Sequence, residues 1–337
     1  MARIDNYYIE LCTEYEILNM TAKEVAALMS RKLYKLTKPG AVESSDHSLL
    51  AVYEKCLSHK KGHTKELYEI TLKKLKDYCG EEKLSVLRFN SINKEWLTSF
   101  DEWMEANNLA TNTRGIHMRN LRHIFNYAID NEITQNYPFR RFKIKTAKTR
   151  KRNIKADKLR EIFAYKCEKA TEQRYLDSFK LIFMLIGINV KDLCYLKAVD
   201  KKRLPNLEYI EYTRAKTKRP YSLKVEPEML EIIKRYQGKK NLLNYMDTNQ
   251  DYRNFYRHMA AHLRRLKEKF DLPELTSYYA RHSWATIAAK LEIPKETIQA
   301  ALGHGQNTVT DIYIDFDMAK VDAANRRVLD YVLYGKE

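Results

Sequence analysis

Three side chains toward the C-terminal end of the chain have the types needed to act on a phosphodiester. Arg281, His304 and Tyr313 lie within residues 278–313, and Tyr313 follows His304 by nine positions. A guanidinium group grips phosphate oxygens in a fork, and an imidazole adds a hydrogen bond to the same oxygens. A tyrosine hydroxyl can attack the phosphorus and form a covalent ester. The stretch has no acidic set for a metal ion, so we expect this chemistry to need no metal and no other cofactor.

Short helices are expected to carry these three side chains. Arg281 opens an apolar run at helical spacing, which predicts that it lies where a buried helix begins and where an anion is favourable. A proline and a glycine bracket a second helix over residues 294–303, which delivers His304 at its exit. A third short helix would carry Tyr313. His282 points to another side of the first helix, and we assign it a structural role.

The composition favours a polyanionic partner. The 337 residues include 61 Lys and Arg against 44 Asp and Glu, and the isoelectric point is about 9.4. A formal net charge of +17 is typical of proteins that bind nucleic acid. The length is sufficient for two domains with separate cores.

The cysteines and the hydropathy indicate a soluble, cytoplasmic protein. The five cysteines are odd in number and far apart, without a CxxC pair, which is typical of a reducing compartment. No stretch is long and apolar enough to span a membrane, and the N-terminus lacks the apolar region of a signal peptide.

The apolar pattern predicts a mainly α fold (α+β) in two domains. Residues 1–46 are interpreted as a helical segment and a linker, and residues 47–146 as a helical domain. A basic linker over 147–156 leads to a second domain at 157–337, which is helical apart from two strand signals. These signals, at 207–212 and 221–225, predict a small antiparallel sheet made of one hairpin with a basic turn.

Two basic surfaces are candidates for contact with a polyanion. Thr113 is a candidate cap of a helix whose apolar stripe spans 116–129, and polar residues beside it supply phosphate donors next to arginines that lie off the stripe. The candidates on this helix are Thr111, Asn112, Thr113, Arg114, Arg119 and Arg122. The linker run has no acidic residue and repels itself unless a polyanion neutralises it. Its candidates are Lys145, Lys148, Arg150, Lys151 and Arg152.

Three segments together resemble the tyrosine recombinases, the phage integrase family. They are ARHSWAT at 280–286, ALGHGQNTVTDIY at 301–313 and the hairpin TRAKTKRPYSLKV at 213–225. A lone LGH or DIY means little, but the ALGH motif followed by this tyrosine is specific as a pair. The resemblance covers about 155–337 strongly and 47–146 more weakly, and its details are most similar to the integrases of Bacteroides mobile elements.

The resemblance implies a helical core-binding (SAM-like) domain and a catalytic domain that clamp duplex DNA. Residues 1–46 are then a candidate end of an arm-binding region. The family's nucleophile falls on Tyr313, and two of its phosphate-binding groups fall on Arg281 and His304. Its hairpin lysine falls on Lys216, which would protonate the leaving 5′ oxygen.

One departure from the family pattern concerns its first arginine. In GINVKDL, residues 187–193, Asn189 stands where the family has that arginine, and Asp192 matches the acidic residue that supports it. Arg214, two positions before Lys216, is our candidate for the missing guanidinium. The alternative is that Arg214 binds DNA backbone beside the site.

A second departure is Tyr278, which stands three positions before Arg281, where the family has a histidine or lysine. A phenol only donates or accepts a hydrogen bond, so the site would lack one cation.

The C-terminal run is an amphipathic helix from Met318 to Val332, with Arg326 and Arg327 on another face. In the family such a helix packs on a neighbouring protomer. Packing on its own domain is equally open from the sequence.

The sequence therefore predicts a site-specific DNA recombinase, an integrase that cuts and rejoins duplex DNA through a covalent 3′-phosphotyrosine intermediate. One alternative is a DNA invertase with the same chemistry, and another is a DNA-binding regulatory protein with impaired catalysis. The expected partners are duplex DNA with specific recombination sites, further copies of the chain in a tetramer, and accessory DNA-bending proteins. The expected location is the bacterial cytoplasm, on the nucleoid when the protein is bound to DNA.

Overall fold

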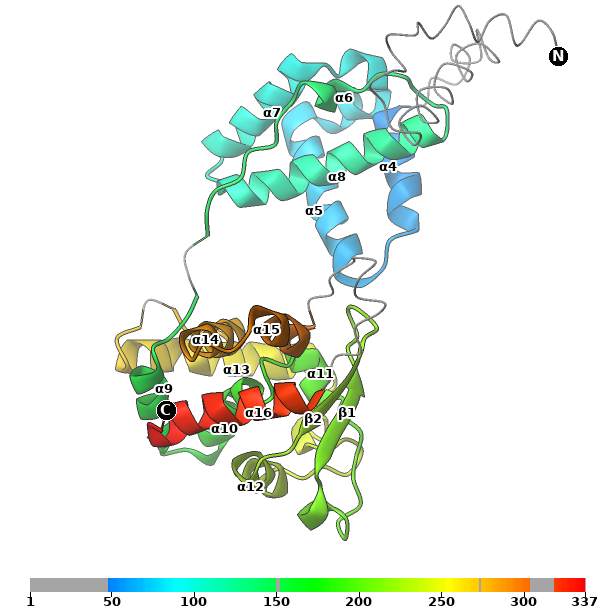
Figure 1. Ribbon diagram of the computed structural model, residues 1–337. Helices are drawn as coiled ribbons and strands as arrows, with labels where there is room; N and C mark the ends of the chain where they lie inside the picture. Colours follow the sequence, from blue (N-terminus) through cyan, green and yellow to red (C-terminus); the bar gives the residue numbers. More distant parts are fainter. Residues whose placement is uncertain (1–47, 150–151, 273, 304–317, 337) are drawn as a thin grey trace, which may run out of the picture. The chain divides into compact units, whose positions relative to one another are not determined.

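The computed structural model describes residues 48–149, 152–272, 274–303 and 318–336 (Figure 1). The chain divides into two units, Met1–Thr149 and Arg150–Glu337. The described residues are mostly helical, and they include one two-stranded antiparallel sheet. This confirms the predicted mainly α fold with a small antiparallel sheet. No helix in the described part combines the length and apolarity that a membrane span requires.

The first unit is built around one long helix. Its helices are α4 (Leu49–Ser58), α5 (Gly62–Cys79), α6 (Glu81–Val86), α7 (Lys94–Ala106) and α8 (Thr111–Asp130), with 3-10 turns at Phe89–Ser91 and Pro138–Arg140. Helix α8 contacts α4, α5 and α7 (Figure 1). The predicted stripe on α8 is buried at Leu121, Ile124, Phe125 and Ala128, because these positions recur at helical spacing.

An extended segment follows the first unit's helices and lies along α8. Phe142 and Ile144 pack against the core of this unit. The amide of Asn112 on α8 donates to the carbonyl of Ala147 (2.9 Å) and accepts from its backbone nitrogen (3.0 Å). The first half of the basic run is therefore fixed to α8 by both apolar packing and backbone hydrogen bonds.

The second unit has a buried helix at its centre. Its helices are α9 (Ala156–Ala164), α10 (Ala170–Met184), α11 (Val190–Cys194), α12 (Pro227–Arg235), α13 (Tyr252–Lys269), α14 (Ser277–Lys290), α15 (Lys295–Leu302) and α16 (Met318–Leu329). Shorter turns lie at Leu204–Asn206, Asn244–Met246 and Asp330–Tyr334. Helix α10 packs against α12, α13 and α14. The apolar residues from Phe179 to Met184 on α10, and Leu185 and Ile186 just after it, are almost entirely buried, because this stretch is apolar on nearly every side.

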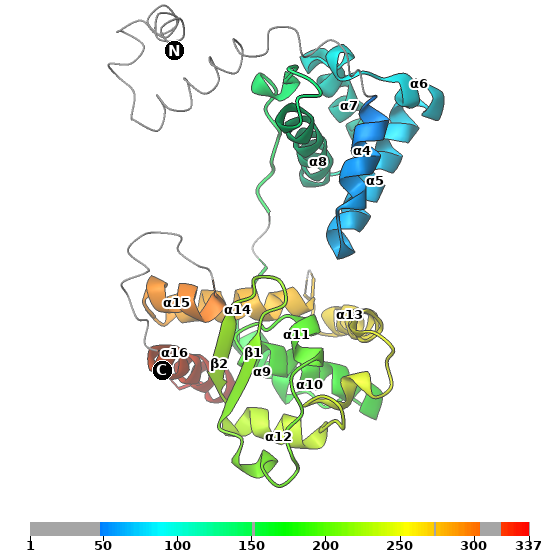
Figure 2. The same ribbon diagram turned by 90° about the vertical axis from the view of Figure 1, so that its right-hand side faces the viewer.

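The hairpin of the second unit consists of β1 (Tyr209–Thr213) and β2 (Pro220–Lys224), and Ile210 pairs with Leu223. Both of these side chains are buried, while their neighbours along the strands are more exposed, as expected for a sheet with one face on the core. The turn lies on the side of α11 and α15, and the open end lies toward α12 (Figure 2). The two strand signals in the sequence are confirmed.

The C-terminal helix packs on its own unit. Helix α16 contacts α14, α15 and β2, and its apolar residues Val321, Val328 and Leu329 are fully buried. Asn325 accepts from Trp284 Nε1 on α14 (2.8 Å) and donates to the carbonyl of Met184 on α10 (2.9 Å). Of the two arrangements that the sequence left open, the structure has the packing within one chain.

Candidate active site

Arg281 lies in the second turn of α14, and not at the start of the helix as predicted. Helix α14 begins at Ser277, so the guanidinium group, and not the first backbone amides, is the group available to an anion. The half-buried Arg281 side chain donates to the carbonyl of Leu302, the last residue of α15. It also donates to the carbonyl of Gly187 (3.3 Å) in the loop between α10 and α11.

The loop after α10 requires a glycine where it meets Arg281. Gly187 has φ +73°, and a Cβ atom there would lie 2.2 Å from the Cβ of Arg281. Ile186 precedes it with φ 55°, a strained conformation for a β-branched residue. The buried loop therefore adopts two consecutive left-handed residues, and the second of them provides the acceptor for Arg281.

Arg214 lies at the same acceptor as Arg281. Its Nη1 donates to the carbonyl of Leu302 at 3.4 Å, from the end of β1. The carbonyls at the C-terminus of a helix carry partial negative charge, which attracts both guanidinium groups. Burial lowers the pKa of Arg281, and the nearby charge of Arg214 lowers it further. Because the two positive groups repel each other, an anion bound between them would be stabilised.

The hairpin turn is held to α11 by Asp192. Its buried carboxylate accepts a hydrogen bond from the backbone nitrogen of Ala215 (3.0 Å), between Arg214 and Lys216. The turn is closed by a hydrogen bond from the nitrogen of Arg214 to the carbonyl of Arg219 (2.8 Å). Lys216 is exposed on this turn. Asp192 thus positions the backbone that carries Arg214 and Lys216.

Asn189 has a local structural role. It is exposed at the N-terminus of α11, and its side chain accepts a hydrogen bond from the backbone nitrogen of Lys191 (2.9 Å). Asparagine is among the best helix-capping residues, which accounts for its presence here.

Tyr278 is half-exposed at the start of α14 and belongs to an aromatic and cationic cluster. Its ring meets the ring of His282 edge-on at 4.5 Å, and the guanidinium carbon of Arg152 lies 5.9 Å from its centre. Burial lowers the pKa of His282, and the charges of Arg152 and Arg281 lower it further. His282 therefore packs as a neutral ring against Tyr278.

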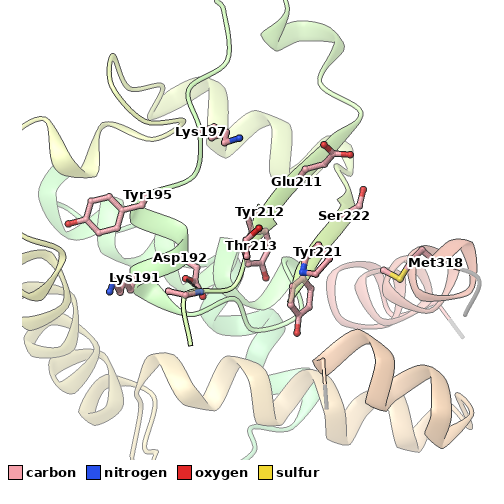
Figure 3. A pocket seen from close by; sticks show the side chains of 12 residues that line it. Lys191, Asp192, Tyr195, Lys197, Glu211, Tyr212, Thr213, Tyr221, Ser222 and Met318 are labelled. Carbon is pink, nitrogen blue, oxygen red and sulfur yellow. Dashed lines mark hydrogen bonds between the residues drawn. The ribbon is translucent and has the colours of Figure 1, made fainter. Parts of the chain in front are cut away.

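Sequence reasoning missed a stacked pair of tyrosines on the hairpin. The rings of Tyr212 and Tyr221 are 5.1 Å apart at 13°, and they line a cavity of about 800 Å³ together with Asp192 and Met318 (Figure 3). The Tyr221 hydroxyl is buried and has no hydrogen-bond partner among the described residues. A Cβ atom on Gly303, which has φ +61°, would lie 1.5 Å from this hydroxyl. The alternation in the sequence predicted the strands but gave no signal for this contact.

Several predicted residues lie outside the described residues. They are Arg150 and Lys151 in the linker, and His304 and Tyr313 near the C-terminal end. The short helix predicted to carry Tyr313 also lies outside the described residues. Helix α15 begins just after Pro294 and ends at Leu302, with Gly303 just past its end, as predicted.

The polar start of α8 differs from its prediction. The helix begins at Thr111, so Thr113 lies in its first turn and is not its cap. The N-cap residue is Ala110, which makes no side-chain capping hydrogen bond. Thr113 is exposed and Thr111 is partly exposed. The amide of Asn112 is already engaged with Ala147, so it positions the linker segment.

The prediction that Arg114 lies on the exposed face of α8 is wrong. Its side chain is 4% exposed and pairs with Asp101 (3.1 Å) and Glu105 (2.7 Å) on α7. The carboxylates of the neighbouring helix compensate the buried charge, which a single-helix pattern cannot show. Arg119 and Arg122 are exposed on the same helix.

The basic linker residues that the structure describes are exposed. They are Lys145, Lys148 and Arg152. Lys145 lies 3.6 Å from the carboxylate of Asp101, which the Arg114 guanidinium also contacts.

Models of known protein families match both units of the chain. A model of the phage integrase SAM-like domain matches residues 48–145, and a model of the phage integrase family matches residues 152–320. A comparison with curated protein sequences gave no match.

Several solved structures have the same fold. A lambda integrase dimer bound to a COC′ core site is 17% identical, with a TM-score of 0.58, and the match covers 80% of this chain and 95% of that one. The Tn1549 transposon integrase in complex with a circular intermediate DNA is 16% identical, with a TM-score of 0.57, covering 83% and 99% of the two chains. A lambda integrase tetramer bound to a Holliday junction is 16% identical, with a TM-score of 0.57 and coverage of 86% on both sides. The second unit matches the family model over half of the chain, and this chain therefore belongs to the phage integrase family, the tyrosine-type site-specific DNA recombinases.

Proposed function

We propose that the protein is an integrase that cuts and rejoins duplex DNA through a covalent 3′-phosphotyrosine on Tyr313. The observation that carries this proposal is the convergence of Arg214 and Arg281 on the carbonyl of Leu302. Leu302 lies two positions before His304 in the sequence, so the segment with the remaining family residues leaves from this point. Two guanidinium groups from different elements make a site for one phosphate.

The proposed reaction uses these groups in order. The Tyr313 hydroxyl attacks the scissile phosphorus and loses its proton to water, and the bond to the 5′ oxygen breaks. A tyrosine hydroxyl, with a usual pKa near 10, is a weak nucleophile at neutral pH, so catalysis depends on stabilising the negative charge that develops on the phosphate. Arg281 and His304 would bind the non-bridging oxygens. Lys216 would protonate the 5′ oxygen, and attack of a different 5′ hydroxyl would reverse the steps.

Arg214 would replace the family's first arginine in this site. The position of that arginine holds Asn189, which is engaged as a helix cap. Arg214 shares an acceptor with Arg281 and stands on the turn that Asp192 holds through Ala215. This geometry supports a role at the scissile phosphate over a role in binding DNA backbone beside the site.

The proposed substrate is duplex DNA with specific recombination sites. Residues 47–146 would act as the core-binding domain and residues 157–337 as the catalytic domain, joined by the basic linker at 147–156. The exposed cations on α8 and on the linker would neutralise phosphates. The relatives in solved structures are bound to DNA, one of them as a tetramer on a Holliday junction, which supports a tetramer of this chain on DNA.

Three finer expectations rest on the sequence. They are an origin in a Bacteroides mobile element, the use of accessory DNA-bending proteins, and action at the bacterial nucleoid. The motifs at 280–286 and 301–313 carry the first of them.

A suicide DNA substrate with a nick near the cleavage site tests the proposed function. The wild-type protein should accumulate a covalent protein–DNA adduct, and Tyr313→Phe should form none, because the phenyl ring has no nucleophilic oxygen. Tight duplex binding without an adduct on any recombination site would instead identify a DNA-binding regulatory protein, the reading that Asn189 as a helix cap favours.

A further inference from the structure

The last part of the linker is anchored directly on the helix that carries Arg281. The backbone nitrogen of Ile154 donates to the hydroxyl of Ser283 on α14 at 2.8 Å. Both residues are buried, with Ile154 3% exposed and Ser283 fully buried. This contact lies within the second unit and fixes where the residues just before Ile154 can reach.

Arg152 is placed by this anchor over the ring of Tyr278. The guanidinium carbon of Arg152 lies 5.9 Å from the ring centre, within the range of a cation–π interaction. The other side of the contact is fixed as well, because the Tyr278 ring meets His282 edge-on at 4.5 Å. A guanidinium group that lies over a ring keeps its N–H donors free at its edge.

Tyr278 is a neighbour of both Arg281 and His282 on α14, although these two consecutive residues point to different sides of the helix. Positions three and four apart are neighbours on a helix, so the Tyr278 ring is adjacent to both other side chains. Burial makes the largest contribution to the lowered pKa of His282, and the charges of Arg152 and Arg281 lower it further. Because Arg152 lies over the ring of Tyr278, it lies about one helical turn along α14 from Arg281.

We propose that Arg152 is a further phosphate-binding residue of the active site. It would supply, from the linker, the cation that the family takes from the position of Tyr278. In this arrangement Tyr278 does not bind phosphate but holds the guanidinium group above its ring. The inference rests on the proposed function, since it names an additional group at the same scissile phosphate.

The test measures the rate of adduct formation on the suicide substrate at saturating DNA. Arg152→Ala should react roughly 10- to 100-fold more slowly than wild type, the range for loss of one charge-assisted hydrogen bond. Placing histidine at the family's position, in the double variant Arg152→Ala with Tyr278→His, should restore most of the rate. A purely structural role of Arg152 would not give this rescue.

Lys166→Ala is the matched control, because Lys166 is an exposed cation of the second unit that lies outside the linker. It should leave the rate at saturating DNA unchanged. An Arg152→Ala rate equal to wild type, or a slow rate that neither Tyr278→His nor Tyr278→Lys improves, would overturn the inference. Failure of the proposed function is distinguishable, because the wild type itself would then form no adduct.

Discussion

Arg214 and Arg281 donate to one acceptor, the carbonyl oxygen of Leu302, although one lies after β1 and the other on α14. The shared acceptor is the end of α15, where the carbonyls have no partner within the helix. Burial and the charge of Arg214 both lower the pKa of Arg281. Bringing the two guanidinium groups together therefore has an electrostatic free-energy cost. A phosphate would offset that cost, and the arrangement is therefore more favourable with an anion bound.

Removal of the Arg214 side chain should impair chemistry more than binding. Arg214→Ala should slow adduct formation at saturating DNA by about 100-fold, as expected for loss of one preorganised donor to a developing charge. Arg214→Lys should recover only part of the rate, because an ammonium group cannot form the two-pronged contact. The measurement is single-turnover cleavage of the suicide substrate.

Arg219→Ala is the control for Arg214, because it removes an exposed arginine from the same turn. It should lower DNA affinity and leave the saturated rate intact. A methylphosphonate at the scissile position lacks the negative charge of the phosphate. With this substrate the cleavage rates of Arg214→Ala and wild type should differ less than with the normal phosphate. Equal saturated rates for Arg214→Ala and wild type would assign Arg214 to backbone binding beside the site.

Gly187→Ala should destabilise the second unit and displace Arg281. The new methyl group would lie 2.2 Å from the Arg281 Cβ, and φ +73° is unfavourable for alanine. Together, strain and overpacking should cost about 2 kcal/mol or more of the free energy of unfolding. Adduct formation should fall as well, because the acceptor at Gly187 would move away from Arg281.

Gly62→Ala separates the strain of a positive φ from the overlap with a neighbouring side chain. Gly62 has φ +56°, but no atom of the described residues lies within 4 Å of the position that a Cβ would take. Gly62→Ala should lower the free energy of unfolding by only about 1 kcal/mol, the cost of the left-handed backbone conformation for alanine. Denaturant unfolding measures this loss. If Gly187→Ala lowers the free energy of unfolding no more than Gly62→Ala does, the loop after α10 can shift to make room for the new methyl group.

Local patterns predicted the elements of the site but not their contacts. The periodicity of residues 280–302 predicted α14 and α15, and the alternation around 207–225 predicted the hairpin. Asp192 was expected to support an arginine, yet it holds the backbone of Ala215. That hydrogen bond and the meeting of Arg214 with Arg281 depend on how the hairpin packs on α11 and α15, which no spacing within one element specifies.

Arg114 and Arg119 lie on one helix and should behave differently. Arg114→Ala leaves the buried carboxylate of Asp101 without its guanidinium partner, so the first unit should lose about 3 kcal/mol of stability. Arg119 is exposed, so Arg119→Ala should leave stability nearly unchanged. If Arg119 contacts one phosphate, its loss should reduce the slope of log affinity against log salt by about 1.

Denaturant unfolding and DNA titrations at several salt concentrations measure the two effects. The Arg114 expectation fails if Arg114→Ala unfolds at the wild-type midpoint. The Arg119 expectation fails if the salt dependence of binding is the same as in wild type. Arg114→Lys is informative as well, because a lysine keeps the charge but cannot reach both Asp101 and Glu105 in the same geometry.

The stability of the first unit should fall in mild acid because of His117. This histidine is 3% exposed on α8, and its Nδ1 lies 2.8 Å from the hydroxyl of Thr71. The Thr71 hydroxyl donates its hydrogen to the carbonyl of Leu67 (2.9 Å), so the His117 ring donates from Nδ1 to the Thr71 oxygen.

Burial lowers the pKa of His117, and the nearby charge of Lys74 lowers it further. The unfolded chain, with a histidine pKa near 6.5, then binds the proton more readily than the folded chain. The contribution of His117 to stability is therefore complete above about pH 6.5 and is lost as the pH falls from there through the folded pKa. Denaturant unfolding of the wild type should show a lower midpoint at about pH 5 than at about pH 7.5.

His117→Gln should reduce this pH dependence, because glutamine can still donate to Thr71 but does not titrate. His59→Gln, on the exposed end of α4, is the matched control and should keep the wild-type dependence. The measurement follows the transition of the first unit by the fluorescence of Trp96 and Trp103, which pack against its core. An identical loss of stability in acid for His117→Gln and the wild type would assign the effect to other groups.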